Sequence, residues 1–141
     1  MRVFAVIAFI LFAWSGYSQD STSARVITKG TASYYASKFN GRKTCSGQRF
    51  SNDSLTAAHK TLKLGTYVKV RNLKNDSTVI VRINDRLPRS SKRSIDLSQR
   101  AARQLDFMKA GLAKVEITVL ETPPVELADK DTAKNEEQPN Y

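Results

Sequence analysis

The stretch Arg82-Ile83-Asn84-Asp85-Arg86 ends a β-branched run over residues 77–81, and Ser94-Ile95-Asp96-Leu97-Ser98 follows soon after it. The run predicts a strand that delivers one carboxylate, Asp85, into a loop rich in arginine. Flanking cations favour the ionised carboxylate and burial favours the protonated form, so the pKa depends on which effect is larger. An acid/base site fits this pattern, and so does a structural ion pair that closes a turn.

Other short segments also have the pattern of strands separated by turns. Alternating or short apolar runs predict strands over residues 31–36, 55–59, 67–73, 78–84, 95–97 and 115–120. Ser98 is a favourable N-cap for an alanine-rich helix over residues 99–105. The predicted fold class is therefore mainly β, a small closed barrel with one short helix.

The N-terminal segment has the features of an export signal. Arg2 precedes an unbroken apolar run over residues 3–14, which is shorter than the roughly 20 residues of a membrane span. Gly16 and Ser18 have the spacing of a cleavage site, so we expect residues 1–18 to be a signal peptide, with an uncleaved anchor as the alternative. No cysteine stands directly after the run, where a bacterial lipoprotein carries its lipid. We expect an exported protein of the periplasm or cell envelope, without a lipid anchor or an integral membrane segment after cleavage.

Charge is distributed unevenly along the chain. The formal net charge is +10, yet residues 121–141 hold six acidic residues against two lysines. We expect flexible segments at 19–28 and 121–141 and one strongly basic folded domain between them, over residues 29–120. Such a domain favours anionic partners, among which export favours the cell wall. We expect no nucleic-acid partner, because no aromatic stacking motif accompanies the charge.

Cys45 is the only cysteine and His59 the only histidine. A single thiol cannot form an internal disulfide, so the fold must depend on packing, and we expect Cys45 to be buried and inert. One cysteine and one histidine make a structural zinc site improbable. We therefore expect no metal and no cofactor.

Seven segments taken in order resemble one family. They cover residues 30–35, 39–44, 46–50, 55–62, 65–70, 81–86 and 95–98. Together they resemble the RlpA-like (rare lipoprotein A) proteins, which implies a six-stranded double-psi β-barrel, a fold shared with expansins. The resemblance also implies an endolytic lytic transglycosylase, a carbon-oxygen lyase that cleaves the MurNAc-β-1,4-GlcNAc bond of peptidoglycan glycan strands and leaves 1,6-anhydroMurNAc ends. One carboxylic acid with a pKa raised toward the working pH can perform this reaction.

Roles follow from the positions that match the family's motifs. The resemblance implies that Asp85 is the general acid/base and that His59 belongs to the catalytic site, where it orients Asp85 or hydrogen-bonds the glycan. The alternative is that His59 is structural and only satisfies the hydrogen bonds of a barrel strand. Arg82 and Arg86 are expected to hold the carboxylate or a sugar substituent through forked hydrogen bonds. The expected substrate-binding residues are Gln48, Arg86, Arg82, Tyr35 and Asp53, and Asp96 is expected to support the barrel.

The chain departs from the family pattern at two acidic positions. Gln48 and Ser51 stand where the family commonly has glutamate and aspartate, and glutamine cannot exchange a catalytic proton at neutral pH. A non-catalytic protein that binds peptidoglycan, or loosens it as expansins loosen walls, is therefore the alternative to the enzyme. In either case we expect a monomer.

Overall fold

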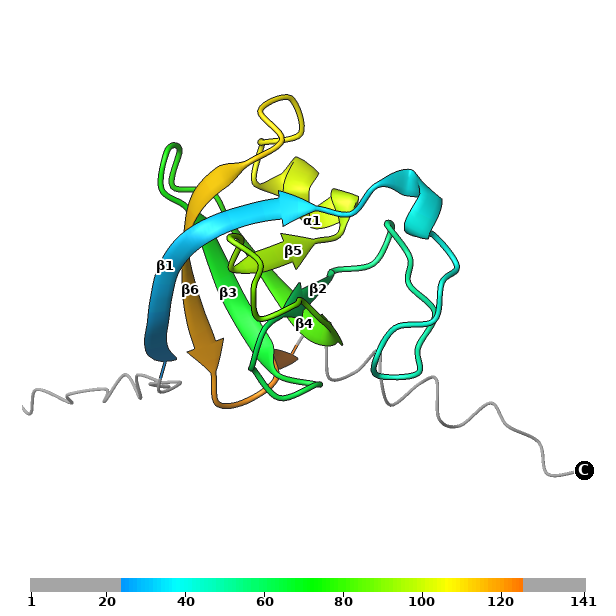
Figure 1. The fold of residues 1–141 in the computed structure, drawn as a ribbon. Helices are drawn as coiled ribbons and strands as arrows, with labels where there is room; N and C mark the ends of the chain where they lie inside the picture. The colour runs from blue at the N-terminus through cyan, green and yellow to red at the C-terminus, as the bar shows by residue number, and fades with distance from the viewer. Residues whose placement is uncertain (1–23, 126–141) are drawn as a thin grey trace, which may run out of the picture.

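The computed structural model describes residues 24–125, so the predicted signal peptide and most of the predicted acidic tail lie outside the described residues. Six strands close into a barrel in the order β1-β5-β2-β4-β3-β6 (Figure 1). The strands are β1 (Ala24–Tyr34), β2 (Thr56–His59), β3 (Tyr67–Asn72), β4 (Thr78–Arg86), β5 (Ile95–Leu97) and β6 (Ala113–Leu120). The β1–β5 and β2–β4 pairs are parallel and the other pairs antiparallel. The predicted small closed barrel is confirmed.

Alternation along the strands fills the barrel with apolar side chains. In β4, Val79, Val81 and Ile83 are buried, whereas the side chains between them are partly exposed. Successive side chains of a strand point to opposite faces, so one set lines the core and the other faces outward. The hydrophobic effect acting on the inner set is the main force that holds the barrel closed.

Helix α1 (Gln99–Gln104) lies over one end of the barrel (Figure 1). The hydroxyl of Ser98 accepts a hydrogen bond from the backbone N–H of Ala101 at 3.3 Å, which confirms the predicted N-cap. Ala101 and Ala102 are buried and belong to the hydrophobic core, together with Leu105 just after the helix. Small side chains on this face allow the short helix to pack closely against the strands.

Strand β1 begins earlier than the sequence predicts. It pairs with β6 from Ala24, opposite Leu120, to Ala32, opposite Ala113. The expectation that residues 19–28 form a flexible segment is therefore wrong for residues 24–28. The last strand supplies the hydrogen-bonding partner for this polar stretch, and a partner so distant in sequence leaves no local signal.

Gly30 lies where β1 approaches the segment that enters β5. A Cβ atom on Gly30 would lie 1.9 Å from Ser94 Oγ and 2.7 Å from Ser94 Cβ. We expect Gly30→Ala to lower the free energy of unfolding by about 1–3 kcal/mol, because the added methyl group overpacks this crossing. Urea denaturation measures the loss, and the double variant Gly30→Ala/Ser94→Gly should recover most of it. An equal loss in the double variant would contradict the steric explanation.

Candidate active site

A β-bulge in β4 directs Asp85 away from the core. Ala57 pairs with Ile83 and Ala58 pairs with Asp85, so Asn84 is an extra residue in β4. Strict alternation would place Asp85 on the inner face with Ile83. Bulges re-aim the side chains that follow them and are common beside functional sites. The carboxylate of Asp85 consequently lies partly exposed among polar groups rather than in the core.

Three hydrogen bonds hold the Asp85 carboxylate. The Tyr35 hydroxyl donates to Oδ2 at 2.7 Å. The backbone N–H groups of Cys45 and Arg86 donate to Oδ1 at 3.1 Å and 2.9 Å. Burial by itself would raise the pKa of Asp85, but the hydrogen bonds from Tyr35, Cys45 and Arg86 together lower it. The expectation of a raised pKa is thus wrong for the free protein, in which Asp85 is ionised at neutral pH.

Aromatic packing fixes the position of Tyr35. Its ring centroid lies 4.3 Å from that of Phe50 and 5.8 Å from that of Phe39. Burial and the hydrogen bond to Asp85 raise the pKa of Tyr35, so the phenol keeps its proton and remains a donor. Tyr35 is predicted to bind substrate, and the structure brings its hydroxyl into direct contact with the carboxylate of the candidate acid.

The loop over residues 41–50 brings a backbone donor to Asp85 and carries Gln48. Its two ends are joined by hydrogen bonds from Gly41 N–H to the Phe50 carbonyl at 2.8 Å and from Phe50 N–H to the Arg42 carbonyl at 2.7 Å. Near its tip, Ser46 N–H donates to the carbonyl of Asn84 at 3.2 Å. The loop is therefore attached to the bulge itself. Gln48 lies exposed on this loop.

Cys45 is exposed, so the prediction of a buried thiol is wrong. It lies near the tip of the loop, where its backbone contacts Asp85. The Asp85 carboxylate beside the thiol raises the pKa of Cys45, so the thiol stays protonated. The glycine-flanked, basic composition around Cys45 was itself the signal for an exposed loop, whereas the general tendency of free cysteines to be buried pointed the other way.

His59 is buried and neutral. Its Nδ1 accepts hydrogen bonds from the backbone N–H groups of Thr61 at 3.2 Å and Leu62 at 3.1 Å, which places the ring proton on Nε2. Burial lowers the pKa of His59, and the nearby charges of Arg86 and Lys60 lower it further. Among the described residues no hydrogen bond joins His59 to Asp85. The structure therefore shows His59 ordering the turn after β2.

Arg86 contacts Asp85 only through its main chain. Its guanidinium donates to the carbonyl oxygen of His59 at 3.3 Å and also to that of Leu62. This side chain thus holds the turn after β2 rather than the Asp85 carboxylate. Arg82 lies four residues before Arg86 on β4, where it is opposite Thr56 of β2 and Tyr67 of β3.

The two remaining acidic candidates have separate places in the fold. Asp96 is buried on β5, where it accepts a hydrogen bond from the Ser33 hydroxyl and pairs with Arg93 at 3.3 Å. The contact with Ser33 joins β1 to β5, and the pair with Arg93 holds the segment that enters β5. Asp53 is exposed, and its carbonyl accepts a hydrogen bond from Arg100 of α1 at 3.0 Å. The structure gives Asp53 no hydrogen bond to Asp85 or to the groups that hold it.

Tyr35→Phe is expected to raise the pKa of Asp85, because it removes a donor that stabilises the carboxylate and leaves the burial unchanged. A carbon-13 NMR titration of the Asp85 carboxyl measures the shift toward higher pH. Tyr34→Phe is the matched control, since the Tyr34 hydroxyl donates to the Met108 carbonyl at 2.8 Å and not to Asp85. A pKa of Asp85 that is unchanged in Tyr35→Phe would contradict the role given to this hydrogen bond.

Residues 24–125 have neither a metal-binding cluster nor a membrane-spanning helix. These residues contain no group of three or more His, Cys, Asp or Glu side chains placed to hold a metal ion. Nor does any helix in this part of the chain have the length and apolar character needed to cross a membrane.

Solved structures with a similar fold include an expansin and a protease inhibitor. Apo-expansin of Clavibacter michiganensis has a TM-score of 0.56 and 22% sequence identity, covering 69% of this chain and 52% of that one. The Streptomyces papain inhibitor has a TM-score of 0.50 and 24% identity, covering 67% of this chain and 94% of the inhibitor. At these identities the likeness concerns the fold.

The sequence relatives share a much higher sequence identity with this chain than these two structures do. The probable endolytic peptidoglycan transglycosylase RlpA of Treponema pallidum is 47% identical over 82% of this chain and 36% of the relative. The endolytic peptidoglycan transglycosylase RlpA of Haemophilus influenzae is 51% identical over 67% of this chain and 33% of the relative. This chain thus matches about a third of the length of these relatives. The lytic transglycolase family matches residues 27–117. Together with the closed six-stranded barrel, these matches show that the chain belongs to the RlpA-like lytic transglycolase family of double-psi β-barrels.

Proposed function

We propose that this protein is an endolytic peptidoglycan lytic transglycosylase with Asp85 as its general acid/base. The observation that carries the proposal is the placement of Asp85. A bulge turns this carboxylate out of the core, and Tyr35, Cys45 and Arg86 hold it with three hydrogen bonds. The names of the relatives supply the reaction and the substrate, and a peptidoglycan substrate places the protein in the cell envelope. We further propose that it is exported, not lipid-anchored, and active as a monomer.

In the proposed reaction Asp85 first donates a proton and then accepts one. Protonated Asp85 donates its proton to the glycosidic oxygen, the bond from that oxygen to C1 of MurNAc breaks, and GlcNAc leaves as an alcohol. The 6-hydroxyl oxygen of MurNAc bonds to C1 and gives its proton to the Asp85 carboxylate. The 1,6-anhydro ring is closed without water, and Asp85 is protonated again. A single carboxyl group therefore suffices, unlike the two that hydrolytic glycosidases use.

The lowered pKa of Asp85 constrains when this reaction can begin. In the free protein most molecules carry the carboxylate at neutral pH, so the acid must be formed as the glycan binds. A bound glycan excludes water from the carboxyl group, and desolvation raises the pKa of an acid. For the free enzyme, kcat/KM is accordingly expected to fall as the pH rises above the pKa of Asp85.

The remaining candidates are proposed to bind the glycan. Gln48 is exposed on the loop that holds Asp85, and its amide suits a sugar hydroxyl. Arg82 and Asp53 are proposed to contact the more distant sugars. Neutral His59 keeps an Nε2 proton that can be donated to the glycan, while its Nδ1 orders the turn after β2.

The reaction is tested in water enriched in heavy oxygen. Purified sacculi, and separately glycan strands stripped of peptides, are digested and analysed by mass spectrometry. We expect anhydro-muropeptides or anhydro-sugars that lack the heavy oxygen and are lighter by one water than a hydrolysis product. New reducing ends that carry heavy oxygen would show a hydrolase, and the absence of any product would refute the enzymatic proposal.

A non-catalytic wall-binding protein is the second candidate function. It is favoured by Gln48, which lacks an exchangeable acidic proton, and by the ionised state of Asp85 in the free protein. Sedimentation with sacculi at low and high salt tests it, because binding through a basic domain weakens as salt screens the charges. Salt-sensitive binding without any cleavage product supports this candidate. A protein that stays in solution even at low salt excludes it.

A further inference from the structure

The tip of the loop beside Asp85 is a three-residue hairpin turn. The N–H of Thr44 donates to the Gln48 carbonyl at 2.8 Å, and the N–H of Gly47 donates to the Thr44 carbonyl at 3.0 Å. Gly47 has a φ of 87°, the left-handed conformation typical of the last residue in such a turn. Resting on the function proposed above, we propose that Thr44 and Ser46 are positioning residues for the reaction. Their hydroxyl groups hold this turn in the shape that directs its free backbone donors at Asp85.

The two hydroxyl groups form a closed ring of hydrogen bonds inside the turn. Thr44 Oγ1 donates to the Gln48 carbonyl at 2.8 Å and lies 2.8 Å from Ser46 Oγ. A hydroxyl has a single proton, and Thr44 uses its proton on the carbonyl, so Ser46 is the donor in the bond between the hydroxyls. Ser46 Oγ in turn accepts from the Gln48 N–H at 3.3 Å. Each hydroxyl thus donates and accepts, which an aliphatic side chain cannot do.

The hydrogen bonds inside the turn determine which backbone donors remain for groups outside it. Three of the five N–H groups of residues 44–48 are used within the turn. The two that remain belong to the successive residues Cys45 and Ser46. Cys45 N–H donates to Asp85 Oδ1 at 3.1 Å, and Ser46 N–H donates to the Asn84 carbonyl at 3.2 Å. Two neighbouring donors of the turn therefore contact two neighbouring residues of the bulge.

The hydroxyl groups act on the acid only through the main chain. Within residues 24–125 no hydrogen bond joins the side chain of Thr44 or Ser46 to Asp85. If the turn loosens, the Cys45 N–H moves away from the carboxylate, while the donors from Tyr35 and Arg86 stay in place. The carboxylate then loses part of its stabilisation, and the pKa of Asp85 rises.

Ser46→Ala and Thr44→Val test this inference in the full chain without any cleavage. Ser46 is exposed and valine has nearly the shape of threonine, so both variants should keep the fold. We expect the carbon-13 titration of the Asp85 carboxyl to move to higher pH. The Cys45 amide proton should exchange with solvent about two- to tenfold faster, the factor that corresponds to one lost hydrogen bond. Ser46→Thr and Thr44→Ser keep the hydroxyl and should give the wild-type values.

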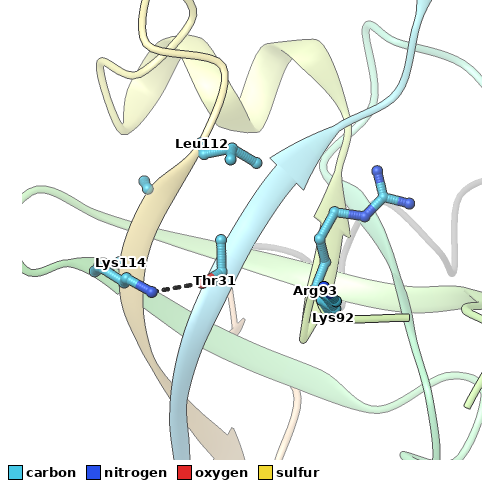
Figure 2. A pocket seen from close by; sticks show the side chains of 6 residues that line it. Thr31, Lys92, Arg93, Leu112 and Lys114 are labelled. Carbon is cyan, nitrogen blue, oxygen red and sulfur yellow. Dashed lines mark hydrogen bonds between the residues drawn. The ribbon is translucent and has the colours of Figure 1, made fainter. Parts of the chain in front are cut away.

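Thr31→Val and Ser91→Ala are the matched controls. Figure 2 shows Thr31 on β1 beside the Lys114 ammonium, which donates to the Thr31 hydroxyl at 3.0 Å. The Ser91 hydroxyl accepts from the Arg93 N–H at 3.2 Å in the segment before β5. Each control removes the same group as its counterpart, but from a hydrogen bond that involves neither the hairpin turn nor the carboxylate. Both measurements should therefore stay at their wild-type values.

The outcomes separate this inference from the proposed activity. In the active enzyme, the fall of kcat/KM with rising pH should begin at a higher pH in Ser46→Ala than in the wild type. The expected NMR changes, together with a wild type that forms no anhydro product, would support the positioning of Asp85 and refute the enzyme. Anhydro products from a Ser46→Ala variant with an unchanged Asp85 titration and unchanged Cys45 exchange would overturn the positioning role and leave the enzyme intact.

Discussion

Asp85→Asn is expected to lower the rate of anhydro-product formation by about 10²–10⁴-fold, the usual range for removing a general acid/base. The amide is nearly the same size as the carboxyl group but cannot exchange the proton that the reaction needs. Its carbonyl oxygen can take the place of Oδ1 and accept from the backbone N–H groups of Cys45 and Arg86, while its NH2 group faces the Tyr35 hydroxyl and can donate to it, so the barrel should remain folded. The rate is measured on sacculi and on stripped glycan strands by quantifying anhydro ends.

A matched control separates this effect from a general loss of charge. Asp106→Asn removes one exposed carboxylate at a residue with φ of 54°, a left-handed conformation that asparagine also adopts. This variant should keep the wild-type rate. If Asp85→Asn also keeps it while its fold is intact, Asp85 is not the acid/base and the wall-binding function becomes the better account.

Leu97→Ala is expected to have the largest effect on stability. Leu97 is fully buried in the barrel, where it pairs with Tyr34 of β1 and Ala57 of β2. Truncation in such a site removes buried apolar surface and leaves a cavity, which costs about 2–5 kcal/mol. The net stability of a small domain is only about 5–15 kcal/mol. The variant should therefore unfold at a clearly lower urea concentration than the wild type.

Leu73→Ala is the control for this measurement. Leu73 follows β3 and is 36% exposed, so its truncation removes less buried surface and creates no enclosed cavity. We expect a loss of less than about 1 kcal/mol for it. Equal losses in the two variants would contradict the assignment of Leu97 to the core.

The elements that the sequence predicts well are those with a local cause. Alternation predicts the strands around Val68 and Val81 and the hairpin between them, and the fold contains both as β3 and β4. Ser98 was recognisable as an N-cap because capping depends on the few residues that follow it. The start of β1 and the exposure of Cys45 were predicted wrongly. For β1 the deciding contact comes from the distant strand β6. For Cys45 the glycine-flanked, basic loop around it indicated exposure, and the general tendency of free cysteines to be buried pointed the other way.

The sequence by itself determined a mainly β domain with a basic surface, and it singled out Asp85 as the candidate acid. These conclusions need only the identity and spacing of residues, because alternation, capping and charge are local properties. Only the tertiary structure decided the state of that acid. Tyr35 and Cys45 lie 50 and 40 residues before Asp85 in the chain, and the bulge at Asn84 exists only in the pairing with β2. Because a pKa depends on every donor and on burial in three dimensions, the closed barrel determines that the carboxyl group is ionised in the free protein.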